Sequence, residues 1–417
     1  MVNFPTELQE SILNFCDAET LVVCSRVCRL LYALARNCLL RRNLILKVDN
    51  TCVGSNIIKE LASPNSRITW RRIKRITLVF VDCTYDDEAL FSGSYTKAAR
   101  GLLDFLKNKL NPESLSIIVE HHWVELFRFD NFAEYLQTTF PNISRLELRL
   151  QYEHLGHLHR FICSFRNLGT LELSFRDLQS RDIDMSLSLP STLHSLYLRL
   201  PTLHLLHRPG PFSHWLGSQF IKVNLTHLSI LECSSYDAIA GTCLHLNSRL
   251  RSLYISMKDG SESGLNSQFN ISHLSHLQDI TFYFPTASSH IQHHFREACR
   301  TIYDCLNSIT SDTLLSVAIV IHPRLLTPPF PKLSPRLDKL LTQSSIFTKA
   351  SLTIVTPTID SGGHDTDYLL SLAKMAFPLF TEAGKNLQVQ TTYRTTNSSW
   401  NPFEQSPIRR SRMYYRR

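Results

Sequence analysis

Apolar and polar positions recur in a fixed order along most of this chain. Each copy of the unit places apolar residues at the first, fourth and sixth of six positions, as in Leu168-Leu171-Leu173. The alternation at the end of the unit predicts a short strand with one buried side. The clear copies are Ile73-Ile76-Leu78, Ile143-Leu146-Leu148, Leu168-Leu171-Leu173, Leu193-Leu196-Leu198, Leu225-Leu228-Ile230, Leu250-Leu253-Ile255 and Leu277-Ile280-Phe282. Weaker copies lie at 115–119, 317–321, 352–354 and 387–389.

Between these predicted strands the apolar spacing changes to that of a helix. The predicted helices span residues 97–110, 132–140, 155–165, 291–309, 335–341 and 368–383. Strands that alternate with helices favour parallel pairing, and therefore an α/β fold.

The repeated unit resembles the leucine-rich repeat. From Ile143 onward the first positions of consecutive clear copies lie 25 to 32 residues apart, against the 20 to 29 typical of that family. The asparagine or cysteine that the family places after the last leucine occurs once, at Cys233, so irregular repeats are expected. The resemblance implies a curved solenoid with parallel strands on the concave face and helices outside, because single units cannot bury their apolar side alone.

A different pattern occupies the N-terminus. Three short segments between Phe4 and Leu46 show helical spacing of apolar residues, which predicts a three-helix domain over residues 1–46. So small a unit exposes much apolar surface, and either the rest of the chain or a partner must cover it.

These segments resemble an F-box. The matching positions are Phe4-Pro5, Glu7-Leu8, Ile12-Leu13, Asp17, Thr20-Leu21, Ser25-Arg26-Val27-Cys28-Arg29 and Tyr32. Two positions depart from the family pattern: Phe4 replaces the usual leucine before the proline, and Leu31 stands where a tryptophan is common.

The resemblance implies a substrate-recognition adaptor of a Skp–cullin–F-box ubiquitin ligase, of a kind with many fungal members. In such proteins the helices bind a Skp-type adaptor and, through it, a cullin–RING ligase, while the repeats bind a protein substrate. The residues expected at the adaptor surface are Phe4, Pro5, Leu8, Ile12, Leu13, Leu21, Val27 and Leu31.

The substrate surface is expected on the repeat strands, at the positions between the leucines. Arginine and tyrosine are enriched there, as they are at protein interfaces, although any exposed strand face is polar. The candidates are Arg145, Glu147, Arg149, Glu172, Tyr197, Arg199, Tyr254 and Tyr283. The mixed charge signs argue against a nucleic-acid groove.

Composition adds bounds. The 417 residues carry a net charge of +8, and five arginines lie within residues 409–417, which favours a disordered basic tail over 395–417. The repeats are then expected over residues 47–394. Eleven cysteines without a Cys-x-x-Cys motif indicate a reducing compartment, so a cytoplasmic or nuclear location is expected. No membrane span and no secretory signal are predicted.

No catalytic constellation is recognisable. The chain has no Gly-x-Ser-x-Gly elbow and no phosphate-binding glycine loop. Two histidine groups, at 154–159 and 290–294, lack the glutamate of a zinc-protease helix and are interpreted as solvated. A non-enzymatic protein without cofactors is therefore expected. The alternative is a repeat scaffold whose N-terminal helices only cap the solenoid.

Overall fold

The computed structural model describes residues 5–16, 18–48, 73–80, 101–119, 132–179, 187–199, 215–235, 246–262, 270–283, 291–321, 335–358 and 366–393, apart from residues 102, 108, 216, 217, 221 and 247. Packing divides the described chain into two compact units, one up to Leu168 and one from Gly169 onward. The predicted division at residue 46, drawn from helical apolar spacing, and at residue 394, drawn from composition, stays a prediction.

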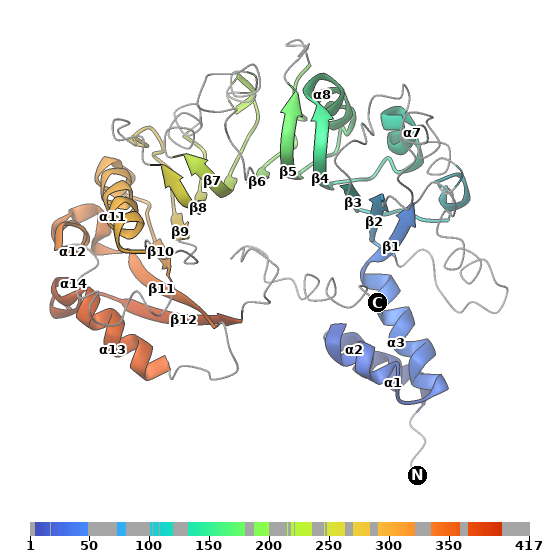
Figure 1. Cartoon of the computed structure of the whole chain (residues 1–417), viewed down its shortest axis with the longest axis horizontal. Coiled ribbons are helices and arrows are strands. Elements are labelled where there is room, and N and C mark those ends of the chain that lie inside the picture. The colour runs from blue at the N-terminus through green and yellow to red at the C-terminus, as the bar shows by residue number, and fades with distance from the viewer. Residues whose placement is uncertain are drawn as a thin grey trace. The chain divides into compact units, whose positions relative to one another are not determined.

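The first unit begins with three helices, α1 (Thr6–Phe15), α2 (Ala18–Cys24) and α3 (Arg29–Arg42). Four parallel strands follow in chain order: β1 (Leu44–Val48), β2 (Arg75–Phe80), β3 (Ser114–Val119) and β4 (Arg145–His154). Helices α7 (Phe132–Thr139) and α8 (Leu155–Ser164) belong to the same unit (Figure 1).

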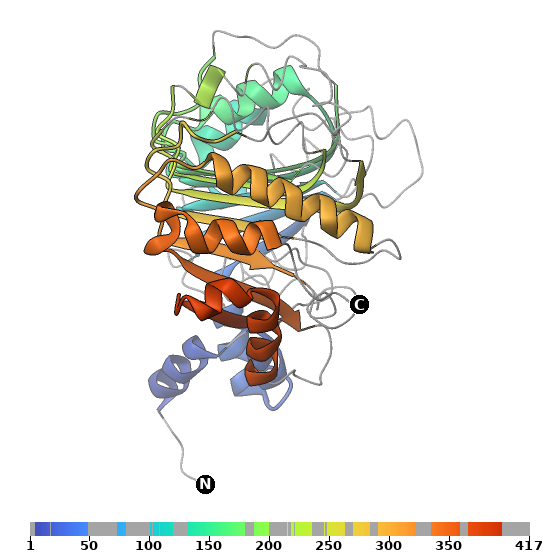
Figure 2. The same cartoon turned by 90° about the vertical axis from the view of Figure 1, so that its left-hand side faces the viewer.

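The second unit continues the alternation. Its parallel strands, again in chain order, are β5 (Thr170–Gln179), β6 (Ser195–Arg199), β7 (His227–Ser235), β8 (Ser252–Glu262), β9 (Asp279–Tyr283), β10 (Ser316–Val320), β11 (Ser351–Thr358) and β12 (Leu387–Tyr393). The helices are α11 (Ile291–Ser308), α12 (Pro335–Gln343), α13 (Thr366–Ala376) and α14 (Pro378–Glu382), with a 3-10 turn at Ser345–Thr348. Figure 2 shows α11 to α14 together on one side of the strands.

The core of each unit consists of rows of apolar side chains that face the helices. One row in the second unit pairs Leu196, Leu228, Leu253, Ile280, Val317 and Leu352 in register across six strands, and all six are buried. Residues between these rows point to the opposite side of the sheet, here called the alternate face. The predicted strands are confirmed, because every copy of the apolar unit within the described residues ends in a strand.

A recurring backbone contact joins the residues just before one strand to those just before the next. The carbonyl of Thr226, just before β7, accepts hydrogen bonds from the amides of Arg251 and Ser252, just before and at the start of β8, at 2.9 and 3.0 Å. The carbonyls of Lys74, Glu113, Gly169, His194, Arg251 and Gln278 each accept two amides of the following unit in the same way. Main-chain groups therefore satisfy one another at the turns, so the sequence there is free to vary.

Residues 44–46, which the helical domain was expected to include, lie in β1, where Leu44 and Leu46 are fully buried and pair with β2. One predicted helix is wrong in its extent. The predicted helix 368–383 is two helices, since Pro378 has no amide hydrogen to continue α13 and instead starts α14. The predicted helix at 97–110 lies partly outside the described residues.

Candidate functional site

The three N-terminal helices share a small core. Leu13 of α1, Leu21 of α2, and Leu34, Ala35 and Cys38 of α3 are almost completely buried against one another. Two hydrogen bonds of cysteine side chains support this packing. The Cys28 thiol accepts a hydrogen bond from the Leu31 amide at the start of α3, and the Cys38 thiol donates to the Asn14 side chain of α1. One side of each helix is therefore used inside the domain.

A second set of apolar side chains on the same helices faces solvent. Leu8, Ile12 and Phe15 follow helical spacing on α1 and are 45%, 53% and 92% exposed. Val23 and Val27, at the end of α2 and in the turn after it, are 62% and 67% exposed. Several large exposed apolar side chains on so short a segment are typical of a protein-binding surface, whereas isolated exposed apolar residues are unremarkable.

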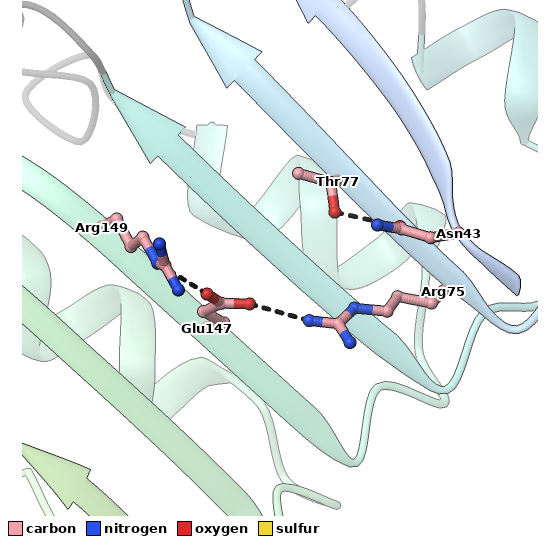
Figure 3. A network of polar contacts seen from close by, with 5 residues as sticks. All are labelled: Asn43, Arg75, Thr77, Glu147 and Arg149. Atoms are coloured by element: carbon pink, nitrogen blue, oxygen red, sulfur yellow. Dashed lines mark hydrogen bonds and ion pairs between the residues drawn. The ribbon is translucent and has the colours of Figure 1, made fainter. Parts of the chain in front are cut away.

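The alternate face of the first unit carries a charged network, drawn in Figure 3. The Glu147 carboxylate on β4 accepts a hydrogen bond from Arg149 Nε at 2.7 Å and one from Arg75 Nη2 of β2 at 2.9 Å. The Glu147 side chain is 1% exposed, whereas those of Arg75 and Arg149 are 13% and 26% exposed. The carboxylate thus lies at the base, and the two guanidinium groups lie nearer to solvent.

The short residues of β3 make this network possible. β3 lies between β2 and β4, so Arg75 must span two strand spacings, about 10 Å, to reach Glu147. Ser114 pairs with Arg75 and Arg145, and Ser116 pairs with Thr77 and Glu147, so small serines occupy the positions of β3 between Arg75 and Glu147. A larger residue at Ser116 would block the arginine. Beside the network, Thr77 donates a hydrogen bond to the Asn43 side chain at 3.0 Å.

The alternate face of the second unit is more deeply buried than expected. Glu172, Tyr254 and Tyr283 are each 5% exposed or less, while Tyr197 and Arg199 are half-buried. Strands only about 4.8 Å apart bring each side chain against its neighbours in both adjacent strands. Tyr254 pairs with Ser229 and Thr281, whose small side chains leave space for a large buried neighbour.

A titratable row starts the strands of this second face. His227, Ser252 and Asp279 pair across β7, β8 and β9. Burial, reinforced by His194, lowers the pKa of His227 below its usual 6.5, although Asp279 acts in the opposite direction. Burial also raises the pKa of Asp279 above 3.8, against the influence of His227. Burial therefore shifts the pKa of each group in the direction that favours its neutral form.

The comparison with known families decides the nature of the N-terminal helices. Residues 1–43 match the family model described as F-box domain. The helices are an F-box. This domain implies binding to a Skp-type adaptor of a cullin–RING ligase. A search of curated proteins found no match to this chain.

The predicted adaptor residues of the F-box fall into four groups. Pro5, Leu8, Ile12 and Val27 are exposed, as that role requires. Leu31 is half-buried and packs against the helical core, and Phe4 lies outside the described residues.

The expected exposure is wrong for Leu13 and Leu21, which are 4% and 0% exposed because they hold the three helices together. Conversely, Phe15 and Val23 are exposed although the family pattern did not single them out. For Phe15, the helical spacing from Leu8 and Ile12 of α1 was the available signal.

The predicted substrate residues divide in a similar way. Arg145, Arg149, Tyr197 and Arg199 are half-buried and keep part of their side chains accessible. The expected exposure is wrong for Glu147, Glu172, Tyr254 and Tyr283, which are buried among the side chains of adjacent strands. Binding by any of the eight stays a prediction.

Other types of site leave little trace in the described part of the chain. No three histidine, cysteine, aspartate or glutamate side chains there come close enough together to hold a metal ion. Within the same residues, none of the helices has the length and apolar character needed to cross a membrane.

Proposed function

We propose that this protein is a non-catalytic substrate receptor of a Skp–cullin–F-box ubiquitin ligase. The F-box binds the Skp-type adaptor through Leu8, Ile12, Phe15, Val23 and Val27. The repeats that follow, which we assign to the leucine-rich class, bind a protein substrate with their alternate face. The observation that carries the proposal is the exposed apolar set on an F-box whose other side is already buried in its own core.

Two properties of the chain support the remaining parts. Seven cysteines whose side chains the structure describes are free thiols, which suits action in the cytoplasm or nucleus. The repeated parallel strands present a long, ordered row of side chains, which suits recognition of an extended partner. Because F-box receptors of this kind have many fungal members, we also expect a fungal origin for the chain.

Capture by the adaptor tests the proposal. A tagged Skp-type adaptor should retain the full-length protein, and Leu8→Asp with Ile12→Asp should abolish retention, because two charges would have to be buried in the interface. Leu315→Asp is the matched control, since Leu315 is 55% exposed but lies in the second unit. Retention of the double variant, or equal loss with the control, contradicts the proposal.

A truncation separates the proposal from the rival idea that the helices merely cap the repeats. Deletion of residues 1–43 removes the F-box but keeps β1 paired with β2. A receptor should lose the adaptor and keep the thermal unfolding midpoint of its repeats. A capped scaffold should instead show a much lower midpoint and lose no partner.

A further inference from the structure

We propose that this protein forms a two-fold dimer in which the last strand, β12, pairs with β12 of a second copy. The pairing is antiparallel and joins the two sheets edge to edge. The inference goes beyond the proposed function and does not depend on adaptor binding. It is carried by an unprotected sheet edge at β12, by exposed apolar side chains in the same repeat, and by the sequence of the strand itself.

β12 is an edge of the sheet within the residues that the structure describes. It pairs in parallel with β11 on one side, and no described strand pairs with its other side (Figure 1). Leu387 continues the core row of Leu352, which is 1% exposed, yet Leu387 is only half-buried. Val389 is likewise half-buried beside the fully buried Ile354. The apolar side chains of the last core layer are therefore still partly in contact with solvent.

The β12 edge lacks the features that usually keep sheet edges from pairing. Natural edge strands are commonly short or carry a charged residue or a proline. β12 has seven residues, LQVQTTY, with no charge, proline or glycine among them. By contrast β1, the first strand of the first unit, has five residues, includes the exposed Lys47 and contacts helix α3. An uncharged segment of six or seven residues with high strand propensity is typical of strands that pair with copies of themselves.

Large apolar side chains are exposed on the helices of the same repeat. α13 contacts β12 and carries Tyr368 and Met375, which are 49% and 58% exposed. Leu379 of α14 is 41% exposed. Elsewhere in the described part of the second unit, Leu315 is the one large apolar side chain that is exposed. Exposed apolar surface in this unit is thus concentrated in its last repeat, as expected where a second chain covers the end of the array.

The sequence of β12 matches a second copy of itself in one orientation. Residues directly opposite one another in an antiparallel pair lie on the same face of the sheet. A two-fold axis at Val389 or Gln390 places odd-numbered positions opposite odd-numbered ones, so the core side of one sheet continues into the core side of the other. Gln388 and Gln390 then lie on the alternate face, and no charge of either strand is opposite a like charge. A parallel two-fold pair would instead turn one sheet over.

Analytical ultracentrifugation of the full-length protein at several concentrations tests the proposal. One strand pair with a small apolar flank is a modest interface, so the mass should rise from that of one chain to that of two as the concentration increases. Gln388→Lys with Gln390→Lys puts lysine opposite lysine for either position of the axis, and should raise the dimer dissociation constant at least about tenfold. Both glutamines are exposed, so the thermal unfolding midpoint should stay unchanged.

Variants of opposite charge give the sharper comparison. Gln388→Glu with Gln390→Glu should weaken the dimer by a similar factor, and this pair also covers the case in which the lysine pair fails to fold. An equimolar mixture of the two variants should form mixed dimers, because each lysine on the axis side then lies opposite a glutamate. The matched control, Asn307→Lys with Gln343→Lys, changes two exposed amide side chains on α11 and α12 and should alter the dissociation constant less than about twofold.

The mass of one chain at every concentration overturns the proposal. So do dimers that both charged pairs leave intact, dimers that the control weakens equally, and failure of the two charged variants to form mixed dimers. If a chain ending at Tyr393 dimerises and the full-length chain does not, the C-terminal segment occupies the edge and the second copy is the wrong occupant.

Adaptor capture is measured on the same preparations, and the lysine pair should be retained like the parent protein. A protein that dimerises but is not captured contradicts the proposed function and leaves the β12 dimer standing. A captured protein that stays a single chain contradicts this inference alone.

Discussion

In most proteins apolar residues are buried and polar residues are exposed. The F-box and the repeat strands depart from this pattern in opposite ways. The F-box leaves large apolar side chains in water, with Phe15 92% exposed. The strands take charged and hydroxyl groups out of water, with Glu147 at 1% and Thr77 also at 1%. Each departure costs free energy in the isolated protein unless something compensates for it.

The two regions differ in where that compensation is found. Glu147 has its partners within the chain, so two arginines compensate for the loss of water around its carboxylate. Asp338 of α12 is a second example, because its carboxylate is 2% exposed and accepts the amides of Leu379 and Phe380 at the start of α14. Among the residues that the structure describes, Leu8, Ile12 and Phe15 of the F-box stay exposed. The buried polar groups are compensated inside the fold, and the exposed apolar groups agree with the adaptor binding that the F-box domain implies.

A matched pair of substitutions in the F-box should show the largest contrast. Leu21→Ala should lower the free energy of unfolding of the helices by about 3 kcal/mol, because it opens a cavity in a very small core. Ile12→Ala should change it by less than about 0.5 kcal/mol but weaken adaptor binding about tenfold. Hydrogen exchange of α1 to α3 reports stability, and adaptor capture reports binding. Similar stability losses in both variants would remove the distinction between the two sides of the domain.

Removal of the buried carboxylate of Asp338 should give the next largest loss of stability. Asp338→Ala should destabilise the second unit by about 2 kcal/mol, since two amides at the start of α14 lose a charged acceptor. Asp338→Asn keeps one acceptor oxygen and should cost about 1 kcal/mol. Urea unfolding followed by circular dichroism measures both. An alanine variant as stable as the parent would show that water replaces the cap.

The buried ion pairs of Glu147 and the exposed pair of Lys74 with Glu113 allow a comparison with smaller expected effects. Glu147→Gln should destabilise the unit by about 1 kcal/mol, because two partly buried arginines lose their charged partner. Glu113→Gln removes the carboxylate that pairs with Lys74, and both of those side chains are more than half exposed. That control should leave the thermal midpoint unchanged, because water screens the pair. Equal midpoints for the two variants would argue that burial adds nothing to the network.

The smallest effect concerns pH. Burial lowers the pKa of His227 below the value of 6.5 that it has when unfolded, so the unfolded chain binds this proton more readily than the folded one. The stability contribution is therefore complete above pH 6.5 and falls as the pH drops from there toward the folded pKa. His227→Gln should remove this pH dependence of the thermal unfolding midpoint across that window. If the midpoint of the variant still falls with pH, another group causes the dependence.

The strands could be predicted because one side of each is always buried. The unit Leu193-Leu196-Leu198 and its counterparts repeat the same contact with the core, and alternation over a few residues suffices to show it. β1 was missed since Leu44 and Leu46 follow directly on the apolar spacing of α3. Three residues cannot distinguish a period of 2 from the end of a helix.

The site was harder to predict than the fold. Helical spacing shows that Leu8, Ile12, Leu13 and Leu21 are all apolar positions, but only packing shows which side each faces. Alternation likewise places Glu147 on the alternate face and says nothing about the arginine that crosses β3 to cover it. That contact joins residues 72 positions apart in the chain, and no local pattern records it.

Asn43 alone separates α3 from β1. Its amide donates to the Leu39 carbonyl at the end of the helix, and its side chain accepts from Thr77 on the sheet, so the joint is tied on both sides. In the proposed receptor, these two hydrogen bonds would fix the orientation of the F-box helices relative to the first strands. A partner bound to the helices would then be held at a defined distance from one bound to the strands. A glycine-rich insertion after Arg42 would make that distance variable without altering either binding surface.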